Sequence, residues 1–148
     1  MEEKYVWNPR ALQNEIQQNI RDAISHIYLK ILKANLTNDT HQNVMVRVDE
    51  MATAKGYTEK LSEWVAKFAE AGYVHKDDLQ RYMAFYDLDH LRKLFKSGSR
   101  FICFHYRRKV KGEFRWVSGE LVSGKECRED NQIVYPVSYT HLTLPTIA

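Results

Sequence analysis

The chain has 148 residues, of which 44% are hydrophobic and 28% charged, and its formal net charge is +3. This composition is typical of an ordinary globular protein and excludes intrinsic disorder. No run of about 18 apolar residues is present, so no membrane-spanning helix is expected, and the small charge without a basic stripe gives no indication of nucleic-acid binding.

The start of the chain and its cysteines indicate a cytoplasmic protein. The first residues, MEEKYVWNPR, lack the basic-then-apolar order of a secretory signal. The two cysteines, Cys103 and Cys127, have neither metal-site spacing nor a second pair. Reduced thiols in the cytoplasm are the plain interpretation.

The first predicted element is an amphipathic N-terminal helix within residues 1–26. Asn8 is a good N-cap and Pro9 suits the first helical position. Apolar residues then recur at three- and four-residue spacing through about Ser25. The stripe they form could pack on its own domain or pair with the same helix of a second chain, so a homodimer is one alternative.

A β-hairpin is predicted over about Tyr28 to Val48. IYLKILKANL is rich in β-branched and apolar residues, TNDT is a turn, and HQNVMVRV has the composition of a returning strand.

Three helices are predicted next. The first starts at its cap, Thr58, and stops at Gly72, with apolar residues on one side. The second, LQRYMAF, is capped by Asp77 or Asp78. The third runs from about Leu88 to Phe95 and ends at Ser97-Gly98. The apolar side of the first helix consists of Leu61, Trp64, Val65, Phe68 and Ala69.

The last predicted elements are strands. RFICFHYRRK and EFRWVSGELV form an antiparallel pair around a tight KVKG turn, and IVY begins a fifth strand after the polar break GKECREDN. Strands, then short helices, then strands predict an α+β domain with helices on one face of an antiparallel sheet. We expect the side of the sheet that carries Trp116 to face these helices and Arg115 to face outward. The basic residues of the turn are expected to be solvated: Arg107, Arg108, Lys109 and Lys111.

Two strings resemble the PAS family of sensory domains. FICFHYRRKVKGEFRWVSGELV is similar to the Tyr-Arg-x-x-x-x-Gly-x-x-Arg-Trp-Val pattern of the PAS C-terminal hairpin. AGYVHKDDLQRY resembles the V-H-P-D-D segment of the helical part, with Lys76 where Pro is usual. The resemblance covers about residues 27–135 and implies a five-stranded antiparallel sheet whose helices enclose a small cavity. The hairpin pattern falls on Tyr106, Arg107, Gly112, Arg115, Trp116 and Val117.

The resemblance implies a sensory or regulatory module of a bacterial signal-transduction protein. With a soluble N-terminal helix first, the chain looks like PAS modules that precede a GGDEF diguanylate cyclase, which makes cyclic-di-GMP. No GGDEF motif is present, so the fragment itself is not expected to be an enzyme, and the output domain would belong to missing sequence. The alternatives are a PAS module of a histidine kinase or a cyclic-di-GMP phosphodiesterase, and a dimerisation module without ligand.

The expected partners are a small-molecule ligand and the missing output domain, and no cofactor is identified. The sequence offers Phe104, Tyr106 and Trp116 as cavity or sheet-face residues. No residue is predicted to be catalytic: Cys103 and His105 share a strand face with Cβ atoms roughly 7 Å apart, and nothing orients the imidazole.

No metal site is predicted either. Asp77 and Asp78 are explained better as helix caps than as ligands beside His75. His105 is expected to be a cross-strand partner, and His90 is a poor candidate for a haem ligand because single histidines usually serve as surface or capping groups.

The C-terminal stretch from Pro136 to Ala148 contains no charged residue. Back-translation of VSYTHLTLPT, residues 137–146, gives ten successive codons that match a transposase adapter used in shotgun sequencing. We therefore expect residues 136–148 to be a non-native, adapter-derived tail, as one recognises a fusion scar. On this hypothesis the natural domain, residues 27–135, is truncated in its last strand.

Overall fold

A computed structural model of the chain describes residue 19, residues 28–54 and residues 59–140. Its five strands are β1 (Tyr28–Asn35), β2 (Thr40–Val46), β3 (Phe101–Val110), β4 (Glu113–Ser123) and β5 (Ile133–Thr140). They form one antiparallel sheet in the order β2-β1-β5-β4-β3. The predicted N-terminal helix, apart from residue 19, and the predicted cap Thr58 lie outside the described residues.

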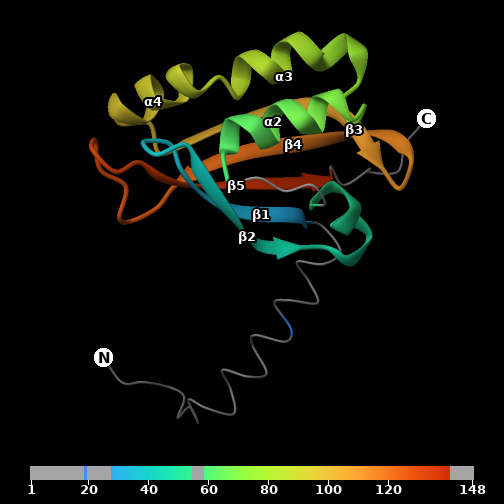
Figure 1. Ribbon diagram of the computed structural model, residues 1–148, viewed down its shortest axis with the longest axis horizontal. Helices are drawn as coiled ribbons and strands as arrows, with labels where there is room; N and C mark the ends of the chain where they lie inside the picture. Colours follow the sequence, from blue (N-terminus) through green and yellow to red (C-terminus); the bar gives the residue numbers. More distant parts are fainter. Residues whose placement is uncertain (1–18, 20–27, 55–58, 141–148) are drawn as a thin grey trace, which may run out of the picture.

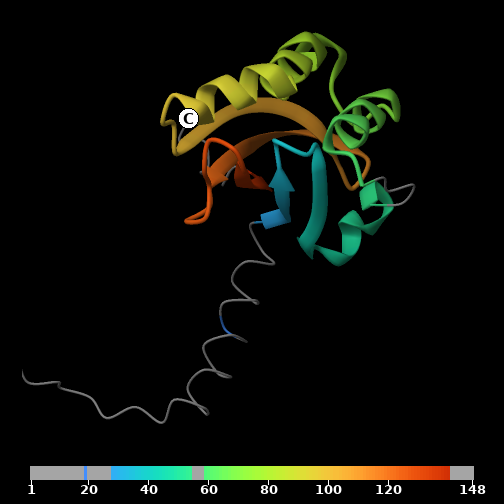
Figure 2. The ribbon, with the colours of Figure 1, turned by 60° about the vertical axis from the view of Figure 1, so that its left-hand side comes forward.

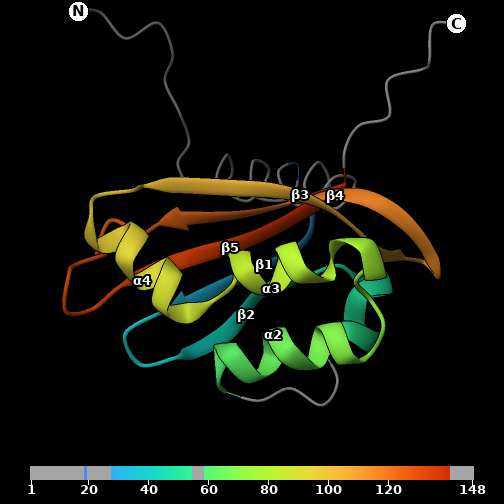
Figure 3. The ribbon, with the colours of Figure 1, turned by 90° about the horizontal axis from the view of Figure 1, so that it is seen from above.

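Three α-helices lie along one face of this sheet: α2 (Leu61–Glu70), α3 (Leu79–Phe85) and α4 (Leu88–Lys96) (Figures 1 and 3). Figure 2 shows β3 and β4 arched beneath α3 and α4. The predicted α+β class, with helices on one face of a five-stranded antiparallel sheet, is confirmed. Two 3-10 segments add to it: η1 (Val48–Ala54), which the sequence analysis did not foresee, and η2 (Lys76–Asp78).

The β1–β2 turn caps helix α2 from a distance. Lys60, the residue before the helix, makes no side-chain cap bond. Instead the backbone N–H of Ser62 donates to Asp39 Oδ1 over 2.8 Å. Asp39 has a φ of 54°, in the left-handed region that Asp tolerates in turns. The helix thus begins at Leu61 because Asp39, 23 positions before Ser62, supplies its missing acceptor.

Local signals set the start of α4, where no cap was predicted, and the predicted stops of α2 and α4. Asp87 accepts from the backbone N–H of His90 at 3.0 Å and so caps α4. Gly72 and Gly98, which follow α2 and α4, have φ values of 86° and 102°, a conformation that glycine adopts readily at helix C-termini.

The core lies between the helices and the sheet. Leu61, Val65 and Phe68 of α2 and Leu91 and Phe95 of α4 are buried. Their sheet partners include Val117, Leu121 and Val134, which are almost completely inaccessible. The apolar periodicity of the two helices is therefore the face that meets the sheet.

The predicted orientation of the β3–β4 hairpin is wrong. Tyr106 pairs with Val117, and both are buried under the helices. Trp116 therefore points to the opposite face, where it is 49% exposed and lies over the Arg107 guanidinium, 5.0 Å from ring centroid to Cζ. Alternation separated the two faces correctly, but it does not say which face the helices cover.

The predicted solvation of the basic residues is also wrong at one position. Arg108 shares the helix-covered face with Tyr106 and is only 1% exposed. The turn itself is as predicted, since Lys111 and Gly112 have φ values of 52° and 79°, the signature of a tight two-residue hairpin turn.

Strand β5 lies in the middle of the sheet and continues past Tyr135 to Thr140. Val137 pairs with Ile31 on one side and with Glu120 on the other. Pro136, which pairs with Leu121, has no N–H to give to the ladder and is rarely found in a central strand. The adapter-derived origin of residues 136–148 stays a prediction, and residues 136–140 complete the strand whatever their origin.

Candidate functional site: a cationic cavity beneath the helices

An enclosed cavity of about 20 Å³ lies between the sheet and helices α2 and α3. It is surrounded by side chains from three strands and from the segments 61–68 and 82–86. Its lining consists of Lys30, Leu32, Leu61, Trp64, Phe68, Tyr82, Tyr86, Tyr106, Arg108, Pro136 and Ser138. The space is large enough for about one water molecule or one small ion.

Lys30 is the first unusual member of this lining. It lies on β1, on the helix-covered face, and is 3% exposed. Its ammonium nitrogen lies over two aromatic rings of α2, 4.6 Å from the Trp64 centroid and 4.9 Å from the Phe68 centroid. Within the described part of the chain, Nζ has no hydrogen-bond acceptor. The rings attract a cation through their faces, but they do not replace the hydrogen bonds that water would give.

Arg108 is the second unusual residue of the cavity lining. One of its terminal nitrogens, Nη2, donates to Glu50 Oε1 on η1. Its Nε and Nη1 have no acceptor among the described residues. Its Cζ lies 4.9 Å from the centroid of Phe68, the ring that Lys30 also contacts. Only one side of this guanidinium is therefore satisfied.

Among the described residues, the charges around the cavity do not balance. Glu50, which is 2% exposed, pairs with Arg108 and acts on Lys30 only through its charge. Burial, reinforced by the nearby positive Arg108, lowers the pKa of Lys30 to about 7, although Glu50 opposes this shift. A buried ammonium without a partner is costly, so near neutral pH the lysine is poised between its charged and neutral forms.

Tyrosines close the other side of the cavity. Tyr82 donates from its hydroxyl to the carbonyl of Val65 at 3.0 Å and so joins α3 to α2. Its ring lies 5.4 Å from that of Tyr106, centroid to centroid. Burial raises the pKa of Tyr106 to about 12, so these phenols stay neutral and act as walls and hydrogen-bond donors.

The structure separates the three residues that the sequence offered for the cavity or the sheet face. Tyr106 lines the cavity. Phe104 stacks on Tyr106, with centroids 4.8 Å apart, and on Phe85, at 4.1 Å, and thus supports the wall from behind. Trp116 lies on the opposite face of the sheet and has no part in the cavity.

Sequence reasoning missed the charged residues, Lys30, Arg108 and Glu50. Period-two alternation from Tyr106 places Arg108 on the same face, so a signal for Arg108 was present. Lys30 and Lys33 both interrupt the apolar pattern of their strand, and the pattern does not tell which of them is buried. Glu50 lies between the predicted hairpin and the predicted cap Thr58, where no element was predicted.

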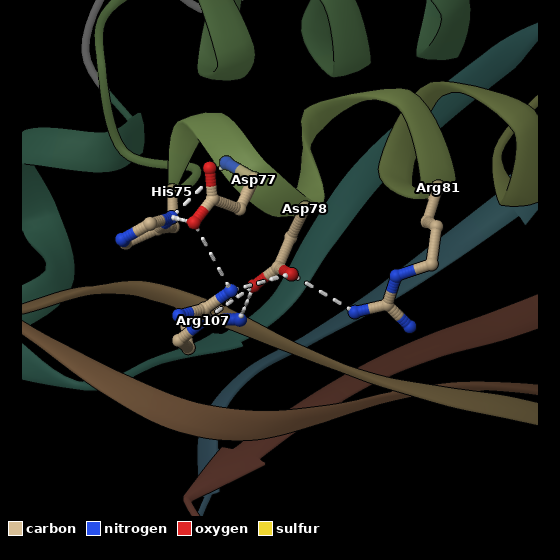
Figure 4. Close-up of polar contacts among 5 residues, drawn as sticks. All are labelled: His75, Asp77, Asp78, Arg81 and Arg107. Carbon is tan, nitrogen blue, oxygen red and sulfur yellow. Dashed lines mark hydrogen bonds and ion pairs between the residues drawn. The ribbon is translucent and has the colours of Figure 1, made fainter.

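A second polar cluster, centred on Asp78, joins η2 and α3 to strand β3 (Figure 4). Asp78 Oδ2 accepts from the backbone N–H and the Nε of Arg107 at 2.8 and 2.9 Å. Asp78 Oδ1 accepts from Nη2 of Arg107 and Nη2 of Arg81, both at 3.0 Å. The hydrogen bonds from Arg107 hold the pKa of Asp78 well below its usual range.

This cluster joins the two strings on which the sequence resemblance rests, because Asp78 belongs to VHKDD and Arg107 to FHYRRK. The predicted capping role of Asp78 is wrong: it makes no side-chain cap bond to α3. The cap of η2 is His75, whose Nδ1 accepts from the backbone N–H of Asp77 at 3.1 Å. Asp78 is a structural anchor of the helical block.

His105 and His90 are the other histidines for which a role was considered. His105 Nδ1 lies 2.9 Å from Ser118 Oγ, directly across the hairpin, so the predicted cross-strand partnership is confirmed. His90 is exposed on α4. In residues 28–54 and 59–140, no group of three or more His, Cys, Asp or Glu side chains is arranged to hold a metal ion.

Two larger hollows, of about 380 and 900 Å³, lie open on the surface. The first borders the β1–β2 hairpin and the second lies between α4 and the β4–β5 loop. Their charged groups are exposed or paired, as Lys96 is with Glu129 at 3.2 Å. The enclosed cavity is the stronger candidate because its charges are buried and only partly compensated.

No helix in the described residues combines the length and apolarity needed to cross a bilayer. No family model and no curated protein matches the chain. Among solved structures, it is similar to the N-terminal domain of a diguanylate cyclase with a PAS/PAC sensor from Marinobacter aquaeolei. The two chains share 12% sequence identity over 74% of this chain and 92% of that one, with a TM-score of 0.47. A likeness this low says nothing of what this chain binds or regulates.

Proposed function

We propose that the chain is the sensory module of a bacterial signal-transduction protein, of the PAS type, and that it controls an output domain encoded after the native fifth strand. The observation that carries this proposal is the closed cavity with its surplus of buried positive charge. A core selected only for stability gains little from two cations with unmet hydrogen bonds, whereas a ligand site needs such groups.

The contacts of Arg108 suggest how binding would be transmitted. Its guanidinium faces the cavity and also holds Glu50 of η1. A ligand that accepts hydrogen bonds from Arg108 changes the strength of the Arg108–Glu50 ion pair. It thereby favours one packing of η1 on the sheet over another. Changing a 1:99 ratio of two states into 99:1 needs about 5.5 kcal/mol of differential binding, which several charge-assisted hydrogen bonds can supply.

For the output domain we propose a GGDEF diguanylate cyclase. The support is the sequence resemblance of the hairpin and of the VHKDD segment, together with the Asp78–Arg107 contact that joins them. In this role the fragment senses and the absent domain catalyses.

The test starts from the native reading frame that follows the codon for Tyr135. In the protein that it encodes, deletion of residues 28–135 is expected to change the basal rate of cyclic-di-GMP synthesis several-fold. A kinase or phosphodiesterase in that place would replace the cyclase but keep the sensory role. A continuation that encodes no signalling domain, or a rate unaltered by the deletion, contradicts the proposal.

A further inference from the structure

We propose that the cavity binds one small monovalent anion, of the size of chloride or formate, between Lys30 and Arg108. That this anion regulates an output rests on the proposed sensory function, whereas its binding does not. The inference comes from the unmet donors, the charge and the size of the site.

The donors point to an anion. The Lys30 ammonium carries three N–H groups and Arg108 keeps two nitrogens, Nε and Nη1, without an acceptor in the described residues. Both side chains line the same enclosed space and both lie over Phe68. A ligand that only accepts hydrogen bonds satisfies both, and a negative charge makes those bonds stronger.

The charge supports the same class of ligand. With Lys30 protonated, two cations and one carboxylate, that of Glu50, meet here among the described residues, so one negative charge completes their balance. The lowered pKa of Lys30 describes the cavity without such a ligand. An anion favours the ammonium form, so binding above about pH 7 takes up a proton. A neutral water molecule in the same place would not favour the ammonium form of Lys30 to the same extent.

The size limits the ligand to one or a few atoms. About 20 Å³ is enclosed, which fits a single small ion. Two lining residues, Pro136 and Ser138, belong to the stretch expected to be adapter-derived, while Lys30, Glu50 and Arg108 lie in the native segments. The charge of the site therefore does not depend on the origin of the tail.

The test compares the unfolding temperature of the 148-residue chain in sodium gluconate, whose anion is too large for the cavity, with that in sodium chloride and sodium formate at equal ionic strength. We expect chloride or formate to raise it by about 2–4 °C. Lys30→Met, which keeps the length of the side chain without its charge, is expected to abolish the rise. Lys33→Met, the same change at the half-exposed lysine of the same strand, keeps it.

Proton uptake gives a second readout. Titration of formate at about pH 8 in buffers of different ionisation enthalpy should show uptake of a fraction of a proton in the unaltered chain and none in Lys30→Met. If Lys30→Met does not fold, anomalous diffraction from crystals of the unaltered chain soaked in bromide decides the question, with a peak in the cavity expected.

Three results overturn the inference: equal unfolding temperatures in all three salts, a full response in Lys30→Met, or an empty cavity in bromide. A fourth result would overturn it for the native protein: an acidic native residue opposite Lys30, in place of Ser138, would neutralise the surplus charge. The two proposals can fail separately. If the anion binds but deletion of residues 28–135 does not change the output activity, this inference holds and only the proposed sensory function is wrong.

Discussion

Neighbouring residues with the same chemistry differ in burial and in their contact partners in this protein. Asp77 and Asp78 follow each other in the chain, yet their side chains are 62% and 4% exposed. Arg107 and Arg108 are also adjacent, but Arg107 binds Asp78 and lies over the exposed Trp116, whereas Arg108 lies on the helix-covered face and binds Glu50. The strand alternation that separates the two arginines is local, while the partner of each comes from a distant segment.

The anchor role of Asp78 predicts a clear loss of stability on Asp78→Asn. The amide cannot accept all four donors as a carboxylate does, and the charge-assisted bonds to Arg107 are lost. We expect a decrease of about 2 kcal/mol in the free energy of unfolding, measured by urea denaturation at pH 7. Asp77→Asn is the matched control, since its ion pairs are exposed and long, 3.8–3.9 Å, and about 0.5 kcal/mol or less is expected.

The anchor role of Asp78 also predicts how the free energy of unfolding depends on pH. The pKa of Asp78 is lower in the folded chain than in the unfolded one, so its stabilisation is complete above the unfolded value of about 4 and is lost as the pH falls further. Below about pH 4, the unaltered chain should lose stability more steeply than Asp78→Asn as the pH falls. Equal slopes would contradict the anchor role.

At the scale of elements, helix α3 and strand β4 meet at a place where only glycine fits. A Cβ atom on Gly119 would lie 2.7 Å from the hydroxyl oxygen of Tyr86 and 3.2 Å from Cε1 of Phe104. The end of α3 can approach the sheet this closely because Gly119 has no side chain.

Gly119→Ala is therefore expected to lower the free energy of unfolding by about 1–3 kcal/mol through overpacking, as measured by denaturant unfolding. Combining it with Tyr86→Phe removes the closest atom, so the double variant should be more stable than the sum of the two single changes predicts. Strict additivity would show that α3 moves away from the sheet without strain.

At the scale of the whole molecule, the last strand in sequence is the middle strand in space. Its residues pair with β1 on one side and with β4 on the other. Without Pro136–Thr140, five of the eight residues of β5 are missing, and both neighbours would expose unpaired backbone groups, a known cause of aggregation.

A chain that ends at Tyr135 is expected to aggregate or to remain largely unfolded, as judged by circular dichroism and size-exclusion chromatography. A chain that ends at Thr140 keeps the described pairs of β5 and is expected to fold. A folded, monomeric chain ending at Tyr135 would show that the sheet does not need the second half of β5. On the adapter hypothesis, a native residue other than proline at position 136 should stabilise the strand further.

Elements whose signals are local could be predicted from the amino-acid sequence. These are the tight turn at Lys111-Gly112, the glycine stops after α2 and α4, and the α+β order of strands and helices. They follow from neighbouring residues, because turn and cap geometry depend on a few adjacent backbone groups.

Three features became known only from the three-dimensional arrangement: the face of the hairpin that the helices cover, the lysine of β1 that is buried, and the capping of α2 by Asp39. It also brought Lys30, Glu50 and Arg108 together. Each of these depends on pairing between segments far apart in the chain, and period-two alternation assigns residues to faces without telling which face is inside. The cavity and its charge are therefore a property of the fold, made of residues that look ordinary in sequence.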